Sequence, residues 1–222
     1  MSKPRAWSYS AITAFETCPK QFYHEKILKE FPFVESPEMK YGNEFHKAAE
    51  LFVRDGTPVP QKFEFTQKVL DNLAGREGVK HLELKLGLTI DLEPCTFFAK
   101  DVWFRAIVDY LSIDGGEARV VDYKTGKSAK YADPDQLELM ALTVFKHYPS
   151  VTFVRAALLY VIADKLVPET YNRGDEAKWA SWVRRVNALQ SAVDNNVWNP
   201  KPSGLCRKHC PVVSCAHNGA NS

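Results

Sequence analysis

The sequence has little net charge and no long apolar run. Its 29 basic and 27 acidic residues leave a formal charge of +2, so the overall charge does not indicate a nucleic-acid-binding protein, although a local basic patch remains compatible with it. No apolar stretch approaches the length of a membrane span, and the first ten residues lack the apolar core of a signal peptide. We therefore expect no membrane partner and a cytoplasmic, reducing setting.

The remaining composition is that of a globular protein. Hydrophobic residues make up 45% and charged residues 25% of a chain of 222 residues, which is long enough for one domain with a substantial core. Five cysteines occur, and in a reducing compartment they favour metal binding or catalysis over disulfide bonds.

The stretch VVDYKTGK, residues 120–127, places two charged side chains in an apolar strand. Successive residues of a strand face opposite sides, so Asp122 and Lys124 share one face. Burying a carboxylate and an ammonium group is unfavourable unless they pair or bind something. A plain ion pair near a strand end is one reading, and a functional site is the other.

A second apolar run, residues 102–113, carries Asp109 and leads into Asp122 through the turn residues 114–116. The two runs predict a β-hairpin that brings both aspartates together, although the sequence does not fix the register. Two converging carboxylates repel each other, and a divalent cation such as Mg²⁺ relieves the repulsion. Lys124 would then stand beside the metal.

A phosphate-binding loop is excluded for the same region. The segment Gly126-Lys127-Ser128 resembles the end of a P-loop, but that motif requires a further glycine five residues before Gly126. Position 121 is valine, so the loop cannot form in this way.

The apolar periodicity of the rest of the chain predicts a mixed α/β core with an N-terminal helical elaboration. We expect a single domain, 1–222, consisting of a helical part (1–75), a core (76–195) and a cysteine-rich tail (196–222) that docks on the first helix. The expected helices are 8–18, 39–54, 64–74, one beginning at Asp133-Pro134, and 175–193; the expected strands are 81–88, the hairpin, and 151–162.

Several polar residues allow both a structural and a functional interpretation. His46 and Glu50 are four residues apart on one helix, so Glu50 could orient a ligating or a purely structural His46. Gln136 falls where a capping box places it, but it also lies close to the end of the Lys124 strand. Lys127 and Lys130 could meet phosphates or be solvated.

The C-terminal tail carries Cys206, Cys210 and Cys215 within ten residues. This density indicates a metal site, which needs a fourth ligand from elsewhere. The spacing alone does not distinguish zinc from an iron–sulfur cluster. The candidates for the fourth ligand are Cys18, Cys95, His209 and His217.

Taken together, these segments resemble RecB-type nucleases of the PD-(D/E)XK superfamily. The pattern is most similar to CRISPR-associated RecB-like exonucleases and phage recombination exonucleases, including those with a cysteine-bound 4Fe–4S cluster. The segments that carry the resemblance are YSAITAFETCPKQFYHEKI (9–27), GNEFHKAAE (42–50), IVDYL (107–111), VDYKTGK (121–127) and QLELMA (136–141).

The resemblance implies a restriction-endonuclease-like fold and a role for each matching residue. His46, Asp109, Asp122 and the backbone carbonyl of Tyr123 would bind Mg²⁺ or Mn²⁺. The catalytic set would be Asp109, Asp122, Lys124 and Gln136, with Lys124 positioning the attacking water and Gln136 orienting Lys124 or a phosphate. Glu50 would support His46, and Lys127 and Lys130 would contact the DNA backbone.

The resemblance also implies a 4Fe–4S cluster held by Cys18, Cys206, Cys210 and Cys215, with structural Zn²⁺ as the alternative. The expected activity is metal-dependent hydrolysis of DNA that is single-stranded or has free ends, by an exonuclease rather than an endonuclease. The expected processes are recombination, repair or phage DNA processing, alongside a single-strand annealing or other recombination protein, in a bacterial host cytoplasm if phage-encoded. An inactive DNA-binding scaffold and a zinc-ribbon interaction protein are the alternatives.

Overall fold

The computed structural model describes residues 6–221, and of Asp175 and Glu176 only the backbone. The chain forms two compact units: Glu35–Lys178 is one, and Met1–Val34 together with Trp179–Ser222 is the other. The predicted division of a single domain at residues 75 and 195 stays a prediction. We refer to the two compact units as the sheet unit and the terminal unit, and describe each by itself.

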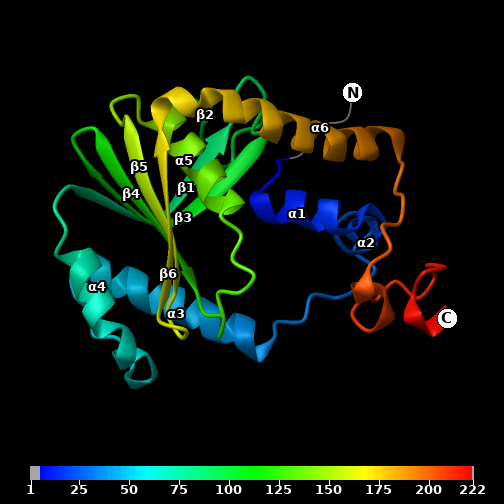
Figure 1. Ribbon diagram of the computed structural model, residues 1–222, viewed down its shortest axis with the longest axis horizontal. Helices are drawn as coiled ribbons and strands as arrows, with labels where there is room; N and C mark the ends of the chain where they lie inside the picture. The colour runs from blue at the N-terminus through cyan, green and yellow to red at the C-terminus, as the bar shows by residue number, and fades with distance from the viewer. Residues whose placement is uncertain (1–5, 222) are drawn as a thin grey trace. The chain divides into compact units, whose positions relative to one another are not determined.

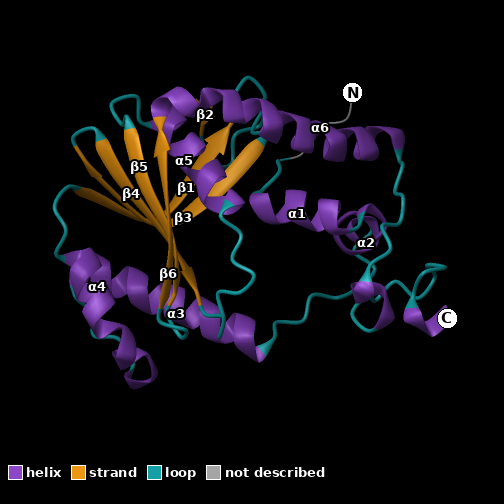
Figure 2. Cartoon of the chain, in the orientation of Figure 1, coloured by secondary structure: helices purple, strands orange, loops and turns teal. Residues whose placement is uncertain are grey.

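The sheet unit contains a six-stranded mixed sheet with the order β2-β1-β3-β4-β5-β6 (Figures 1 and 2). All neighbouring strands are antiparallel except β4 and β5, which are parallel and are connected through helix α5. The strands are β1 (Val79–Leu88), β2 (Pro94–Cys95), β3 (Phe104–Asp114), β4 (Glu117–Lys124), β5 (Phe153–Tyr160) and β6 (Lys165–Asn172).

The predicted hairpin is confirmed. In the pairing of β3 with β4, Asp114 lies opposite Glu117 next to the turn, and Tyr110 lies opposite Val121 at the far end. Gly115 in the turn has a φ of 54°, a left-handed conformation that glycine adopts without steric strain. The sequence signal was reliable here because turn chemistry and β-branched strands agree.

Helices cover both faces of the sheet (Figure 1). Helix α5 (Asp135–His147) packs against Val108 and Leu158 on one face. Helices α3 (Pro37–Asp55) and α4 (Gln67–Ala74), the latter preceded by the 3₁₀-helix η2 (Gln61–Thr66), pack against Tyr110 and Tyr123 on the other. This arrangement is the α/β class that the sequence predicts.

Helix α3 begins two residues earlier than predicted. Ser36 caps it by accepting a hydrogen bond from the Met39 amide, and Pro37 occupies the first helical position. The prediction placed Pro37 before the helix. Proline is tolerated at the first helical position because the helix does not use the backbone N–H there. Gly56, with a φ of 74°, ends the helix.

Strand β6 has no counterpart in the sequence prediction. Its sequence, KLVPETYN, is polar and contains Pro168, which weakens the strand pattern. A proline is tolerated here because β6 lies at the edge of the sheet and pairs with β5 alone. A 3₁₀-helix, η3 (Arg173–Lys178), follows it.

The terminal unit joins the two ends of the described chain. The Ser8 side chain caps α1 (Tyr9–Thr17), and Trp198 stacks on Tyr23 with 4.8 Å between the ring centroids. The backbone N–H of Lys201 donates to Cys18 Sγ, so the tail does contact the first helices. The other elements of this unit are α2 (Pro19–Phe22), the π-helix η1 (Tyr23–Ile27), α6 (Trp179–Asn195), η4 (Gly204–Arg207) and η5 (Gly219–Asn221).

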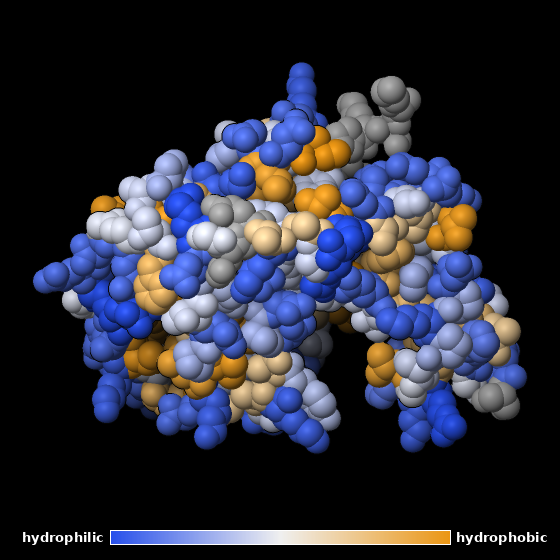
Figure 3. Space-filling view, turned by 45° about the horizontal axis from the view of Figure 1, so that its top comes forward, coloured by the Kyte–Doolittle hydropathy of each residue, from blue (hydrophilic) through white to orange (hydrophobic). Residues whose placement is uncertain are grey.

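Hydrophilic residues predominate on the face shown in Figure 3, and the apolar residues there form separate small groups. Among residues 6–221, no helix is both long and apolar enough to span a bilayer.

Candidate active site

Asp109 lies where β3 separates from β4. The pairing of the two strands ends at Tyr110–Val121, one residue before Asp109. Beyond this point the Asp109 carboxylate replaces the missing strand contact, because its Oδ2 accepts a hydrogen bond of 2.7 Å from the Tyr123 backbone N–H. The side chain is buried. The hairpin therefore delivers Asp109 to the end of β4, as the sequence predicts.

Asp122, Lys124 and Gln136 form a closed ring of polar contacts in the sheet unit. The Gln136 side-chain amide donates to Asp122 Oδ1 at 2.6 Å, and its carbonyl oxygen accepts from Lys124 Nζ at 2.9 Å. Lys124 Nζ lies 2.6 Å from Asp122 Oδ2. Gln136 is in the first turn of α5, and its side chain contacts these residues instead of forming a capping box. The ring fixes the position of the ammonium group.

The Asp122 carboxylate is buried and incompletely satisfied. Its ion pair with Lys124 lacks the geometry of a hydrogen bond, so Oδ2 has no hydrogen-bond donor. Burial raises the pKa of Asp122 to about 6, the negative charge of Asp109 adds to the rise, and Lys124 partly offsets it. A buried acceptor beside a second carboxylate is an environment that favours a cation.

His46 projects from α3 toward the same carboxylates. Its Nδ1 lies 3.4 Å from Asp109 Oδ1 and 3.6 Å from Glu83 Oε1. Burial alone would lower the pKa of His46, but hydrogen bonding to Asp109 and Glu83 and their charges outweigh it and raise the pKa to about 10. The Tyr123 ring packs edge-on against the imidazole, with 5.7 Å between the centroids. The structure therefore brings His46, Asp109 and Glu83 together. Asp122 lies near enough that the charges of Asp109 and His46 affect its pKa, although it is not in the group whose ligand atoms lie within 4.8 Å of one another.

Glu83 is the member of the site that the sequence analysis missed. It lies on β1 opposite Asp109, because Leu82 pairs with Tyr110 and Leu84 pairs with Val108. Its φ of 49° is a left-handed conformation that is strained for a glutamate and that interrupts the regular strand. The alternating pattern of residues 81–88 indicates a half-exposed strand, and only the register with β3 identifies Glu83 as a neighbour of the site.

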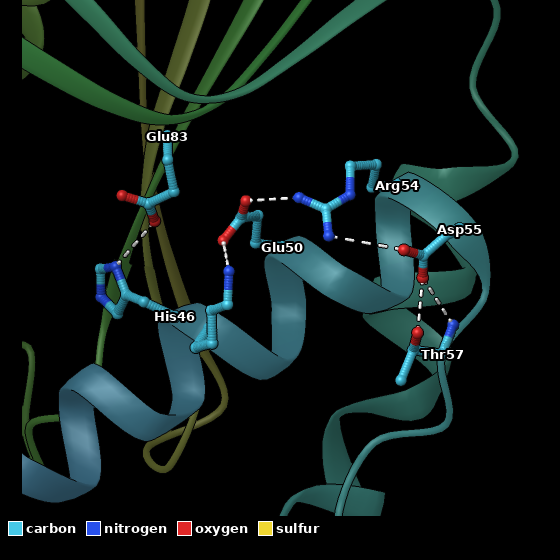
Figure 4. A network of polar contacts seen from close by, with 7 residues as sticks. His46, Glu50, Arg54, Asp55, Thr57 and Glu83 are labelled. Carbon is cyan, nitrogen blue, oxygen red and sulfur yellow. Dashed lines mark hydrogen bonds and ion pairs between the residues drawn. The ribbon is translucent and has the colours of Figure 1, made fainter.

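Glu50 does not contact His46 in the structure. Its two oxygens accept hydrogen bonds of 2.8 Å from Lys47 and Arg54, while the His46 ring points to Glu83 (Figure 4). The supporting position that the sequence analysis gave to Glu50 is therefore taken by Glu83. The reason is that Lys47 and Arg54, each about one turn away on α3, occupy both oxygens of Glu50.

The ligand atoms fit a hard divalent cation. One oxygen each from Glu83 and Asp109 and one nitrogen from His46 lie within 4.8 Å of one another. Within residues 6–221 this is the one group of three such residues that meets this distance. Carboxylate oxygens and an imidazole nitrogen are suitable ligands for Mg²⁺ or Mn²⁺, so the residues present fit the predicted metal.

Lys127 and Lys130 lie in the loop that follows β4. Lys127 is close enough to Glu38 that its charge contributes to lowering the pKa of that carboxyl group. Lys130 Nζ lies 5.3 Å from the ring centroid of Tyr131, whose side chain is 84% exposed. Contact of these lysines with DNA stays a prediction.

The four predicted cluster cysteines all line one cavity in the terminal unit, together with His217. All are free thiols. Among the described residues, no three of these cysteines place their sulfur atoms within 4.8 Å of one another. The structure therefore contains no formed set of metal-binding thiols, and the iron–sulfur cluster stays a prediction.

Residues 6–215 match the PD-(D/E)XK nuclease superfamily. The chain belongs to this superfamily. The matched segment includes every residue of the candidate site and all four cysteines of the cavity. The mixed sheet with helices on both faces agrees with a PD-(D/E)XK fold, as the sequence predicts.

Solved structures match this superfamily member over most of its length. A "Putative exonuclease" from Eubacterium rectale has 13% sequence identity and a TM-score of 0.53, and the match covers 92% of this chain and 87% of that chain. The crystal structure of SSO0001 has 14% identity and a TM-score of 0.47, with 95% and 85% covered. No curated protein matches the chain.

Proposed function

We propose that the protein is a metal-dependent deoxyribonuclease that hydrolyses phosphodiester bonds as an exonuclease. The observation that supports this most strongly is the buried Asp122 Oδ2, which has no hydrogen-bond donor. The Asp109–His46 pair is its neighbour in the same site. Mg²⁺ or Mn²⁺, when bound, polarises the scissile phosphate and lowers the pKa of water. The ligands would be His46, Asp109, Asp122 and the Tyr123 carbonyl, with Glu83 added to the predicted set.

Lys124 is the group that acts on the reactants. An ammonium group has three hydrogens, and the hydrogen bond to Gln136 engages one of them, while the ion pair with Asp122 holds the nitrogen in place. A remaining hydrogen can therefore hold the attacking water or a phosphate oxygen. Gln136 and Asp122 act as positioning residues, because they hold the ammonium group at the end of β4 before substrate arrives.

The loop after β4 is proposed to hold the DNA backbone. Lys127 and Lys130 supply positive charge, and the exposed Tyr131 ring offers a surface for a base. A role in recombination, repair or phage DNA processing, with an annealing or other recombination protein as partner, rests on the resemblance of the motifs alone.

The test of the proposed activity is digestion of end-labelled single-stranded and double-stranded DNA with Mg²⁺, with Mn²⁺ and with EDTA. We expect linear DNA to be shortened progressively with metal and to remain intact with EDTA. Closed circular DNA of the same sequence is the control, because an exonuclease needs an end. Absence of cleavage with either metal would support the inactive scaffold, and cleavage of the circle would show an endonuclease.

The proposal extends to a 4Fe–4S cluster in the terminal unit. Cys18 Sγ and Cys206 Sγ each accept a hydrogen bond of 3.4 Å, from the backbone N–H groups of Lys201 and Ser203. Such bonds stabilise thiolates and tune cluster potentials. Four thiolates on one zinc ion would lie about 3.8 Å apart, from a Zn–S length of about 2.3 Å. A cavity whose thiols are spaced more widely suits a larger cluster better.

Anaerobic reconstitution with iron and sulfide tests the cluster. We expect the wild-type protein to gain visible absorbance and about four irons per chain. Cys18→Ser should lose the colour and lower the melting temperature of the reconstituted protein, because the cluster would connect the two ends of the chain. Cys95→Ser is the matched control, since Cys95 lies on β2 and should have no effect. Full colour in Cys18→Ser, or stoichiometric zinc with no iron, would contradict the assignment.

A further inference from the structure

We propose that Lys85, Phe97, Phe98 and Arg105 form a binding site for single-stranded DNA that leads to the candidate active site. We refer to these four residues as the aromatic platform. The inference rests on the proposed nuclease activity for its purpose, but its test measures binding without cleavage.

Two phenylalanines and two cations form this cluster. The rings of Phe97 and Phe98 meet edge to face, with 5.1 Å between their centroids. The Arg105 guanidinium carbon lies 5.1 Å from the Phe97 centroid and 5.7 Å from that of Phe98, and Lys85 Nζ lies 5.9 and 6.0 Å from them. Phe98 is 75% exposed, so its ring is accessible to a ligand.

The two cations of the platform have no anionic partner. Among residues 6–221, neither Lys85 nor Arg105 forms an ion pair with a carboxylate, and the buried Nε of Arg105 has no hydrogen-bond acceptor. Lys62 and Arg155, by contrast, lie over aromatic rings but are neutralised, because Lys62 pairs with Glu44 and Arg155 pairs with Glu117. The platform therefore retains positive charge for an anionic ligand.

Strand geometry places the platform on the sheet face that carries α3. In the pairing of β1 with β3, Lys85 lies opposite Ile107, and Gly87 lies opposite Arg105. Their neighbours Leu86 and Val108 are buried against α5 on the other face. Because side chains alternate along a strand, Lys85 and Arg105 face the side of α3, from which His46 projects.

The platform continues the line of the metal ligands along the same two strands. Lys85 is two residues beyond Glu83 on β1, which corresponds to about 7 Å. Arg105 is four residues from Asp109 on β3, or about 13 Å. A strand of DNA with one phosphate at the metal ligands would thus have its neighbouring nucleotides beside the platform.

Gly87 explains how the phenylalanines reach this face. A Cβ atom at position 87 would lie 2.9 Å from the carbonyl oxygen of Thr96 and 3.1 Å from that of Cys95. The segment from β2 to Phe98 therefore crosses closely over β1 at this residue, on the side where a side chain would be. The close approach requires glycine and holds Phe97 and Phe98 above Lys85 and Arg105.

The chemistry of the platform fits single-stranded DNA. Exposed aromatic rings stack with unpaired bases, and adjacent cations contact the phosphates. In a duplex the base faces are already stacked on one another and only base edges are accessible in the grooves. An exposed ring between two unpaired cations therefore favours a single strand over a duplex.

The test is binding of a fluorescein-labelled oligothymidylate in EDTA, followed by fluorescence anisotropy. Phe98→Ala should weaken binding about tenfold or more, the effect of losing one stacked base. Phe98→Tyr should retain the affinity and Phe98→Leu should lose it, because stacking requires a ring. Phe65→Ala removes another exposed phenylalanine, which lies in η2 outside the platform, and is the control, expected to bind as wild type. Equal affinity of Phe98→Ala and wild type would overturn the inference.

An oligonucleotide with a single abasic position, moved along the strand, gives a second readout. One position should weaken binding to wild type, and the same position should have no effect on Phe98→Ala, since the ring that the base contacts is already gone. Arg105→Gln should reduce the slope of log affinity against log salt by about 0.7, the value for one phosphate of a single strand. An unchanged slope, or tighter binding of duplex than of single strand, would contradict the platform.

These measurements separate the platform from the nuclease proposal. Binding in EDTA does not require cleavage, so loss of affinity in Phe98→Ala supports the platform even if no DNA is digested. Conversely, hydrolysis of a small phosphodiester such as bis(p-nitrophenyl) phosphate needs the metal site alone. Hydrolysis of this substrate by the wild-type protein therefore tests the nuclease proposal without reference to the platform.

Discussion

Lys124→Ala is expected to abolish DNA cleavage while the protein remains folded and still binds Mn²⁺. The ammonium group is held at the end of β4 by the ion pair with Asp122 and the hydrogen bond to Gln136, and a remaining hydrogen is available to the attacking water or the phosphate. Removing one preorganised donor of this kind lowers turnover by about 10²–10³-fold, and losing its help to the nucleophile adds to that. We therefore expect a loss of about a thousandfold or more.

The assay should run at pH 8. Lys124 opposes the rise in the pKa of Asp122, so the variant holds its proton at Asp122 to a higher pH than wild type. At pH 8 the carboxylate remains available in both proteins. Lys127→Ala is the control. This lysine lies three residues after Lys124, outside the ring of contacts with Asp122 and Gln136, and its removal should lower the DNA affinity only in part. Near-normal cleavage by Lys124→Ala with intact Mn²⁺ binding would remove Lys124 from the mechanism.

Asp122→Asn is expected to abolish cleavage and, at the same time, to stabilise the metal-free protein. The pKa of Asp122 is raised from 3.8 to about 6, mainly by burial and then by the charge of Asp109. A carboxyl group with a raised pKa destabilises the fold once it ionises, by about 1.4 kcal/mol per pKa unit. Asparagine keeps an oxygen for the Gln136 amide and carries no charge. We expect a gain of about 3 kcal/mol in the free energy of unfolding.

The pH dependence fixes the sign of this effect. Below pH 3.8 the carboxyl group is protonated in both the folded and the unfolded state, so wild type and variant should be equally stable. Between pH 3.8 and 6 the unfolded wild type ionises first, and its stability falls relative to the variant. Above pH 6 the difference should be constant.

Urea denaturation in EDTA at pH 4 and at pH 7.5 measures this difference. Asp91→Asn removes an exposed carboxylate of the loop after β1 and is the control, expected to change stability little at either pH. Adding Mn²⁺ should stabilise wild type by mass action and should stabilise Asp122→Asn much less. A variant that is less stable than wild type at pH 7.5 in EDTA would show that Asp122 is a structural ion pair and not a strained metal ligand.

The sequence was sufficient for the core of the site because its signals are local. Strand alternation places Asp122 and Lys124 on one face, the Asp-Gly-Gly turn forces the hairpin, and that hairpin returns Asp109 to Asp122. Gln136 follows from the position of the helix start. Each of these depends on residues within about 30 positions of one another, so little tertiary information was needed.

The remaining features depend on pairing between distant segments. Glu83 becomes a neighbour of Asp109 only through the register of β1 with β3, and its left-handed backbone conformation leaves no mark in the sequence. Glu50 has the expected spacing from His46, but Lys47 and Arg54 compete for it. Strand β6 contains Pro168, which the sheet tolerates because β6 is an edge strand. These outcomes were set by contacts that a single sequence does not reveal.

The central claim is that His46, Glu83, Asp109 and Asp122 hold one catalytic cation. The most direct measurement is a crystal structure with Mn²⁺, in which anomalous scattering locates the ion without reference to the protein. We predict an anomalous peak bonded to His46 Nδ1 and to oxygens of Glu83, Asp109 and Asp122. A peak elsewhere, or a His46 side chain turned away from both aspartates, would contradict it.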